Sequence, residues 1–405
     1  MEPRQQRGLE IAQRCRIDKD KYRGFWFVPS QSEKKHYHVM VGRVSFCTCP
    51  DYELRGDKCK HIYAVEYTLE SSTKTDGSTM ISETVQVSEI PRPTYGQNWT
   101  AYNRAQTTEK DQFQSLLHDL CSNIHQPPQG KGRPRIPLSD ALFAATFKIY
   151  STFSGRRFMS DLRDAQAKGF IGQVPHYNSI FNYLENPELT PILTNMITRS
   201  AMPLKTIETA FAVDSSGFMT SRFTRWYDQK YGAVRQSHDW VKAHIMCGVK
   251  TNVVTAVEIQ GQHTGDGIML PSLLAHTAKH FDVQEVLADK GYSSAKNMEA
   301  ILAANATPYI AFRSNTTGRD AGQTWERMFH YFSFNKEKFF AHYHQRSNVE
   351  STFMMIKTKF RDHVRSKTDT AMRNEVLCKI LCHNICCVIS AICELGIDHD
   401  AFCRA

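Results

Sequence analysis

The sequence predicts an α/β protein in which a mixed sheet with helices on its faces follows a helical region and a small cysteine-containing unit. Three observations predict this order. Four soft metal ligands lie close together before residue 70, short helical segments run from about 107 to 205, and strand patterns alternate with helical ones from about 206 to 395. The chain of 405 residues is long enough for two or three such parts.

The composition is that of a packed protein with a moderate basic charge. Lysine and arginine outnumber the acids by 50 to 41, which gives a net charge of +9 and favours anionic partners such as nucleic acid. No uninterrupted apolar run reaches the ~18 residues of a membrane span, and the polar N-terminus lacks the apolar core of a signal peptide. We therefore expect no membrane and a cytoplasmic location, with the 12 cysteines reduced or bound to metal.

The first unit is predicted to span residues 1–70 and to bind zinc. A strand pattern, HYHVMVGRVSF, precedes Cys47 and Cys49, and a helical pattern, CKHIYAVEYTLE, begins at Cys59 and contains His61. Two close pairs of sulfur and imidazole ligands suit tetrahedral structural Zn²⁺, and cysteines that only pack are the alternative. Residues 71–106, rich in Ser and Thr with two prolines, are predicted to be a linker.

Residues 107–205 are predicted to be a helical DNA-binding region. Short helical segments with tight breaks suit a helix-turn-helix unit, and HYNSIFNYLENP is the candidate start of its recognition helix. A plain bundle that joins domains is the alternative. The stretch GKGRPR resembles the core of an AT-hook, whose arginines, here Arg133 and Arg135, enter a narrow minor groove. A basic linker before a helix is the alternative for this stretch.

Residues 206–395 are predicted to form the mixed sheet. ETAFAVDSSG has the pattern of a buried strand that ends at Asp214. WVKAHIMCGV and NVVTAVEIQ predict a hairpin, a helix is expected from Gly267 to His280, and VQEVLADKGY predicts a strand that ends at Asp289. A helix near 295–304 and the strand TPYIAF follow, and then helical segments run to the end. In open α/β sheets, chemistry collects where such strands end.

A third acid, Glu350, lies in a helical stretch, YHQRSNVESTFMMIK. Here Tyr343, Arg346, Glu350 and Lys357 project within an arc of roughly 60° of one helix, and a neighbouring apolar stripe marks the buried face. Three carboxylates from two strand ends and one helix suit Mg²⁺ (or Mn²⁺), and a pair of such ions supports phosphoryl transfer. Arg346 and Lys357 would then hold DNA phosphates. A salt-bridged surface helix and loop-capping aspartates are the alternatives.

The apolar helical stretch NEVLCKILCHNICCVISAICEL contains a second group of cysteines, which we expect to pack as small apolar side chains. A metal or redox role is the alternative. The group consists of Cys378, Cys382, Cys386, Cys387 and Cys393.

The helical stretch with the third acid resembles the DDE transposases of bacterial insertion sequences. Its four polar residues match the Y-(2)-R-(3)-E-(6)-K signature of one group within that family, and AVDSSG and DKGY match the family's two aspartate motifs. The resemblance covers about residues 130–395. It implies an RNase H-like catalytic domain with Asp214, Asp289 and Glu350 as the metal ligands. CTCPDYELRGDKCKH resembles a SWIM zinc finger, which implies a module that binds nucleic acid or protein.

The leading hypothesis for function is a transposase that cuts the ends of an insertion sequence and joins them to target DNA. We expect it to act on double-stranded DNA as a homodimer or higher oligomer, in the bacterial cytoplasm at the nucleoid. A transposase-derived DNA-binding protein that no longer cuts is an alternative, although all three acids are present. A metal-dependent nuclease without strand transfer is another, because the same site serves both reactions.

Overall fold

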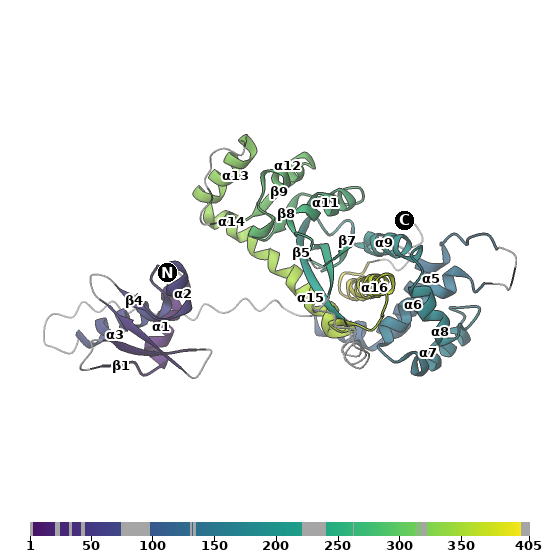
Figure 1. Cartoon of the computed structure of the whole chain (residues 1–405), viewed down its shortest axis with the longest axis horizontal. Helices are drawn as coiled ribbons and strands as arrows, with labels where there is room; N and C mark the ends of the chain where they lie inside the picture. The colour runs from purple at the N-terminus through teal and green to yellow at the C-terminus, as the bar shows by residue number, and fades with distance from the viewer. Residues whose placement is uncertain are drawn as a thin grey trace, which may run out of the picture. The chain divides into compact units, whose positions relative to one another are not determined.

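The computed structural model describes residues 3–20, 25–31, 35–41, 45–73, 98–129, 132, 135–220, 240–261, 263–313, 316 and 322–397. They divide into two compact units, Met1–Thr94 and Tyr95–Ala405, each with its own hydrophobic core. Figure 1 shows the helices and strands of both units.

The smaller unit packs helices against a four-stranded antiparallel sheet of order β1-β2-β3-β4. Helix α3 lies against β2 and β3, and α1 packs on α3. Gly8 permits that close approach, because a Cβ there would lie 2.6 Å from Cβ of Tyr63. The predicted strand HYHVMVGRVSF is two paired strands, and the predicted helix is α3. The elements are α1 (Pro3–Arg14), β1 (Asp18–Lys19), β2 (Trp26–Pro29), β3 (His36–Met40), β4 (Phe46–Cys47), α2 (Pro50–Arg55) and α3 (Lys60–Thr73).

The larger unit is built on a mixed sheet of order β7-β6-β5-β8-β9, with β10 beside the far end of β5. The pairs β5–β6 and β6–β7 are antiparallel, and β5–β8, β8–β9 and β5–β10 are parallel. The sheet confirms the predicted α/β class and the predicted hairpin. Its strands are β5 (Ala210–Thr220), β6 (Trp240–Gly248), β7 (Val254–Gln260), β8 (Glu285–Ala288), β9 (Thr307–Ile310) and β10 (His363–Val364).

Helices flank this sheet, with α9 and α11 against β7 and α15 against β5. Those before the sheet are α4 (Trp99–Thr107), α5 (Glu109–Ser122), α6 (Leu138–Ser151), α7 (Gly155–Ala167), α8 (Tyr177–Leu184) and α9 (Leu189–Ala201). Those after its first three strands are α11 (Leu270–Ala278), α12 (Ala295–Ala303), α13 (Gln323–Phe334), α14 (Lys336–Tyr343), α15 (Ser347–Phe360) and α16 (Asp369–Leu395).

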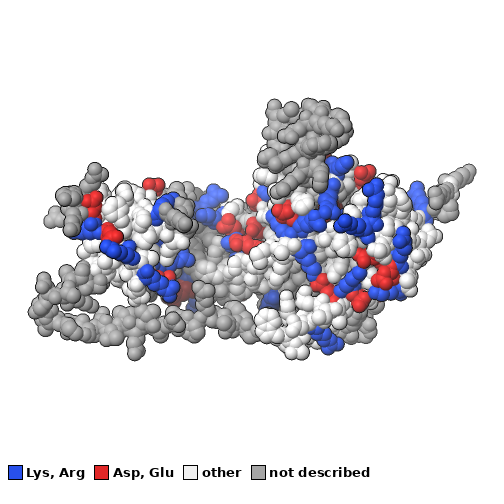
Figure 2. Space-filling model, turned by 90° about the horizontal axis from the view of Figure 1, so that it is seen from below, with Lys and Arg blue, Asp and Glu red and all other residues white. Residues whose placement is uncertain are grey.

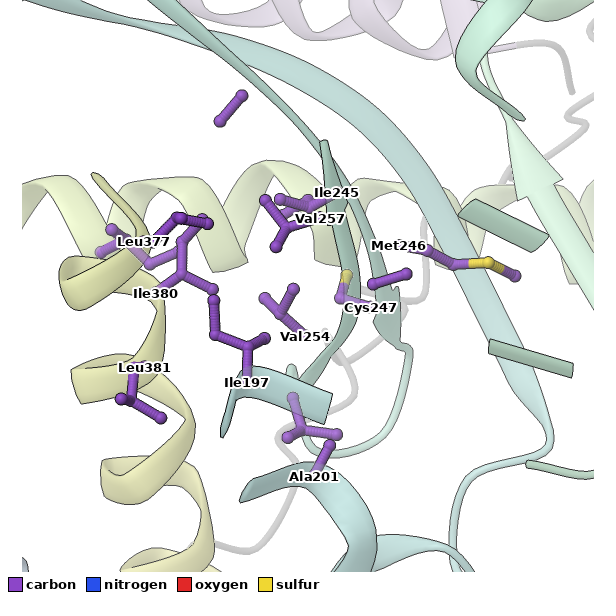
Figure 3. Packing of buried hydrophobic residues seen from close by; sticks show 14 of the residues in the cluster. Ile197, Ala201, Ile245, Met246, Cys247, Val254, Val257, Leu377, Ile380 and Leu381 are labelled. Carbon is purple, nitrogen blue, oxygen red and sulfur yellow. The ribbon is translucent and has the colours of Figure 1, made fainter. Parts of the chain in front are cut away.

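Helix α16 joins the helical region and the sheet into one core. It packs against α4, α5, α6, α8 and α9 and also against β6 and β7. In Figure 3, Ile197 of α9, Val254 of β7 and Ile380 of α16 meet in this core. Residues 107–205 are therefore not a separate bundle. Helical periodicity predicts which face of each helix is apolar, but it does not predict that a distant helix covers those faces.

The composition of α16 alone would allow it to cross a membrane. It holds a window with a mean hydropathy of 2.0, and 72% of that window is buried within the protein, as in the core helix of a folded domain. It is the one helix of this length and composition in the part of the chain that the structure describes. Its Cys378 and Cys382 are fully buried, which agrees with the predicted packing role.

Three expected boundaries are wrong. Strand β5 does not end at Asp214 but continues to Thr220, because the backbone of its Ser- and Gly-containing half keeps pairing with β6 and outweighs the weak strand propensity of those residues. The stretch 343–357 is not one helix, since the 3₁₀ turn His344–Arg346 separates α14 from α15. Residues 99–106 of the predicted linker 71–106 belong to α4, which the side chain of Asn98 caps and α16 covers, and residues 74–97 lie outside the described part of the chain.

Candidate active site and zinc site

The four predicted zinc ligands come together in the smaller unit. Cys47 ends β4, Cys49 precedes α2 as its N-cap, and Cys59 and His61 lie at the start of α3. All four are buried, and their ligand atoms lie within 4.8 Å of one another. His61 points its Nδ1 at two of the sulfurs, 3.9 Å from Cys47 Sγ and 3.8 Å from Cys59 Sγ.

The chemistry of this cluster fits a tetrahedral Zn²⁺. The contact with Cys47 lowers the pKa of Cys59 despite the opposing effect of burial, which favours the thiolate form that binds metal. The same contact, together with burial, raises the pKa of Cys47. The cysteines that the structure describes are all free of disulfides. Three thiol sulfurs and one imidazole nitrogen suit a structural zinc, and the cluster therefore suggests one.

Asp214 and Asp289 lie side by side on neighbouring parallel strands. Val213 of β5 pairs with Ala288 of β8; Asp214 is the next residue of β5, and Asp289 is the first residue after the end of β8. Each carboxylate accepts a hydrogen bond from the backbone N–H that follows it. Ser215 donates to Asp214 Oδ1 at 2.8 Å, and Lys290 donates to Asp289 Oδ1 at 2.6 Å. The strand register thus fixes the two acids at one level of the sheet.

Glu350 comes to the same region from α15, which packs on β5. Its side chain is 59% exposed, and its Oε1 lies 3.0 Å from Nη2 of Arg346. The guanidinium of Arg346 also lies near the ring of Tyr343, 5.8 Å from its centroid. The predicted apolar stripe of α15 is the buried face; it consists of Val349, Phe353, Ile356 and Phe360.

The acids and Arg346 act on one another electrostatically. Burial raises the pKa of Asp214, and the carboxylates of Asp289 and Glu350 raise it further. The hydrogen bond from Ser215 and the charge of Arg346 oppose this rise. These opposing influences act on Asp214 together, and burial is the largest of them.

The three carboxylates do not form a closed cage as they stand. Within the described residues, one set of His, Cys, Asp or Glu side chains lies close enough together to bind an ion, and that set is the four zinc ligands. Glu350 is paired with Arg346 instead. Asp214 and Asp289 are placed by rigid strands, whereas the exposed Glu350 side chain has freedom to turn on its helix.

Lys357 lies over the part of β5 that continues past Asp214. Its Nζ donates to Ser216 Oγ at 2.7 Å and lies 5.4 Å from the centre of the Phe218 ring. Alternate residues of a strand point to the same face, so Asp214, Ser216 and Phe218 share one face of β5. Burial lowers the pKa of Lys357, and the charge of Asp362 opposes this effect. The lysine therefore belongs to the face that carries the first acid.

The basic stretch 130–135 is placed only in part. Arg133 lies outside the described residues. Arg135 is exposed, and its backbone N–H donates to Gln129 Oε1 at 3.1 Å. The candidate recognition helix is α8, which packs on α6 and α7 and exposes the ring of Phe181.

One polar cluster beside the acids escaped the sequence analysis. Ser215 of β5 donates to Asp266 Oδ1 at 2.7 Å, and Nζ of Lys242 lies 2.6 Å from the same oxygen. His244, which is fully buried, lies 3.6 Å from it through Nδ1, and burial lowers its pKa. The sequence signal for this cluster is the pair Lys242 and His244. They are two residues apart on an apolar strand, so both side chains lie on one face of it.

The fold and the cluster of acids define the class. A mixed sheet with acidic side chains on its central parallel strands, closed by helices, is an RNase H-like domain. Residues 205–385 match the family model of the transposase DDE domain, and residues 37–70 match that of the SWIM zinc finger. These matches confirm the predicted resemblance and indicate a transposase-type enzyme that acts on DNA. A search of curated proteins and a search of solved structures found no match.

Proposed function

We propose that this protein is a DNA transposase that cleaves the ends of an insertion sequence and joins them to target DNA. The observation that supports it best is the placement of Asp214 and Asp289 at one level of the sheet, with Glu350 on α15, which packs on the strand of Asp214. We further propose that it acts as a homodimer or higher oligomer on double-stranded DNA in the bacterial cytoplasm.

The donor set fits hard divalent ions such as Mg²⁺ or Mn²⁺, which prefer carboxylate oxygens. Asp214 and Asp289 would hold such ions, and Glu350 would complete the set after leaving Arg346. When bound, a pair of ions activates the attacking oxygen and stabilises the leaving one in an in-line phosphoryl transfer.

The reaction proceeds in two steps. In the first, water attacks the phosphorus at the element end, the bond from phosphorus to the 3′ oxygen breaks, and a 3′-hydroxyl is left. In the second, that hydroxyl attacks a phosphodiester of the target, whose own 3′ oxygen leaves. Arg346 and Lys357 bind phosphate oxygens beside the acids and so position the strand. Lys357 is held at Ser216, two residues along the strand from Asp214, in a place suited to a neighbouring phosphate.

The zinc finger is proposed to recognise DNA and to depend on Zn²⁺ for its fold. In the larger unit, α8 and the basic segment with Arg133 and Arg135 are proposed to contact duplex DNA. DNA contacts by these parts of the protein would place the end of the insertion sequence at the three acids.

The test is cleavage and joining by the full chain with Mg²⁺ and a duplex that carries the inverted repeats flanking the gene. Asp289→Asn should abolish both reactions and leave duplex binding in place. Asp282→Asn is the matched control, because Asp282 is an exposed acid before the same strand. Cleavage without joining would favour the nuclease. Binding with no cleavage by the wild type would favour the non-cleaving DNA-binding protein.

A further inference from the structure

A basic pocket lies at the junction of α6, α15 and α16 and plays no part in the proposed chemistry. We call it the basic pocket and define it by six lining residues. These are Lys148, Thr152, Arg361, Arg365, Glu375 and Lys379. Four of the six are cationic and one is acidic, so the pocket carries excess positive charge.

The single carboxylate of the pocket is engaged by neutral donors of the 365–366 segment and by Lys379. Glu375 accepts hydrogen bonds from the backbone N–H groups of Arg365 and Ser366 and from the Ser366 hydroxyl. Its oxygen lies 3.7 Å from Nζ of Lys379, which also donates to the carbonyl oxygens of Arg361 and His363. Glu375 and Lys379 thus hold the 361–366 segment in place.

Lys148 is a buried cation that lacks a counter-ion of its own. It is 4% exposed, and its ammonium group makes no hydrogen bond or ion pair with any residue that the structure describes, whereas its backbone carbonyl accepts from Ser151 Oγ. Its Nζ lies near the ring of Phe181, 5.7 Å from the centroid. Burial lowers its pKa, Glu375 opposes this, and Arg361 and Arg365 add to the lowering. A buried charge in such a position is costly unless a ligand neutralises it.

Arg361 stands where the backbone favours glycine. Its φ is +76° and its ψ is 146°, a region that residues with a Cβ rarely enter. Its guanidinium donates to the carbonyl oxygen of Thr152 at 3.2 Å, and Arg365 donates to the same oxygen at 3.4 Å. Thr152 also has a positive φ, +56°. A guanidinium has five N–H donors, so both arginines retain donors for a ligand.

The pocket continues the face that carries the acids. The ring of Phe218 lies between two lysines, 5.4 Å from Nζ of Lys357 and 5.5 Å from Nζ of Lys379. Phe218 is four residues past Asp214 on β5, a distance of about 13 Å along a strand. That is close to the length of four nucleotides of duplex DNA, at about 3.4 Å each. Figure 2 shows lysine and arginine side chains gathered in a band on one face of the larger unit.

We propose that the basic pocket binds a backbone phosphate of the DNA substrate, several nucleotides from the phosphate that reacts. The buried ammonium of Lys148 neutralises the charge of this phosphate, and Arg361 and Arg365 donate hydrogen bonds to its non-bridging oxygens. The proposal rests on the proposed action on DNA. The competing explanation is structural: the two arginines only cap the C-terminal carbonyls of α6, which ends at Ser151.

The two explanations differ in what single variants of the full chain should do. Arg361→Gly removes the guanidinium and also relieves the backbone, so the melting temperature should change little while DNA binding weakens. Asn305→Gly is the matched control, because it relieves a positive φ of +59° at an exposed residue outside the pocket and removes no charge. Lys148→Met keeps most of the length of the buried side chain and removes its charge. It should raise the melting temperature and weaken DNA binding. Lys279→Gln removes an exposed lysine outside the pocket and serves as the second control.

The measurement is the salt dependence of binding to a duplex that bears the inverted repeats. Each phosphate contact contributes about 0.9 to the slope of log affinity against log salt. Arg361→Gly and Lys148→Met should each lower the slope by about one. The double variant should lower it no further, because both side chains hold the same phosphate. The two control variants should keep the wild-type slope.

Wild-type slopes in both pocket variants would overturn the proposal and leave the proposed function intact. Failure of the wild-type protein to bind the duplex would overturn both. A further measurement distinguishes binding of a free anion from binding of a DNA phosphate: inorganic phosphate is added and the melting temperature is measured. If phosphate stabilises the wild type but not Lys148→Met, and the two bind DNA with the same slope, the pocket holds a free anion and the assignment to DNA is wrong.

Discussion

The guanidinium of Arg346 lies 3.0 Å from the carboxylate of Glu350, one helical turn away. Glu350 is 59% exposed, and an exposed pair at this spacing is worth only about 0.3–0.5 kcal/mol. A bound divalent ion therefore competes easily for the carboxylate. Release of Glu350 would free Arg346 for a phosphate, so metal binding and DNA binding are expected to support each other.

Glu350→Gln should abolish cleavage with little effect on folding. Loss of a residue that only supports a metal ligand costs about 10–100-fold, so loss of a ligand should cost at least about 100-fold. Cleavage of the element-end duplex and its binding are measured side by side. Glu337→Gln is the control, as an exposed acid on the preceding helix. Wild-type cleavage by Glu350→Gln would remove this residue from the site.

Cys59→Ser should release zinc and unfold the smaller unit. Apparent binding free energies of structural zinc are about 10–16 kcal/mol, more than a small unit can replace. Elemental analysis should find one zinc per wild-type chain and less in the variant, and limited proteolysis should then cut before residue 70. Cys15→Ser, a half-buried cysteine of the same unit outside the cluster, should retain the metal. Wild-type protein purified without chelator and found free of zinc would contradict the assignment.

Lys357→Ala should flatten the salt dependence of DNA binding by about one unit of slope, since one phosphate contact is lost. The loss should be similar for different sequences, because phosphates carry no base identity. Ser216→Ala is the control that removes the hydrogen bond and keeps the charge. An unchanged slope together with a lower melting temperature would show that Lys357 has a structural role.

Asp214→Asn should stabilise the metal-free protein at neutral pH. Burial raises the pKa of Asp214 above its ordinary value of 3.8, so the folded protein favours the protonated form. The stability that this preference provides is present at low pH and lost as the pH rises through the raised pKa. An asparagine at position 214 is uncharged at every pH, so the variant keeps this stability at neutral pH.

The difference in melting temperature between Asp214→Asn and the wild type should therefore grow from acid to neutral pH. Added Mg²⁺ should stabilise the wild type and not the variant. A variant that is less stable than the metal-free wild type at neutral pH would show that Asp214 serves the fold. Asp282→Asn, which alters an exposed acid, should show neither effect.

A fragment of residues 95–205 should not fold alone. Its helices share their core with α16, and without that helix their apolar faces are exposed to water. Circular dichroism should show little helix and no cooperative melting. A fragment of residues 95–397 should melt cooperatively. Cooperative melting of the shorter fragment would mean that the helical region is an independent domain.

Much of the sheet could be predicted, because its signals are local. The hairpin of β6 and β7 follows from two apolar runs joined by a short turn, and β8 ends at Ala288, one residue before Asp289, close to where its pattern indicates. Helix α12 lies within a residue of its predicted range. The zinc ligands were found because their spacing reflects the geometry of one ion.

The features that escaped prediction depend on long-range pairing. The second half of β5 is held by β6, and the contact of Asp266 with Ser215 arises only when a loop folds back over the sheet. The coverage of five helices by α16 depends on tertiary packing. The backbone angles of Thr152 and Arg361 have no sequence signal, since neither residue is glycine.

The position of α16 in the chain also bears on how the protein is made. Every helix and strand on which α16 packs is synthesised before α16. Until α16 has been made, each of these elements exposes the apolar face that α16 covers in the folded protein. Such incomplete chains are prone to aggregate and are the usual clients of chaperones. By length and composition α16 itself could cross a membrane, and in the folded protein its docking on these partners buries most of it. Nascent chains that stall before residue 369 should therefore be unable to complete the core, and the cell should degrade them.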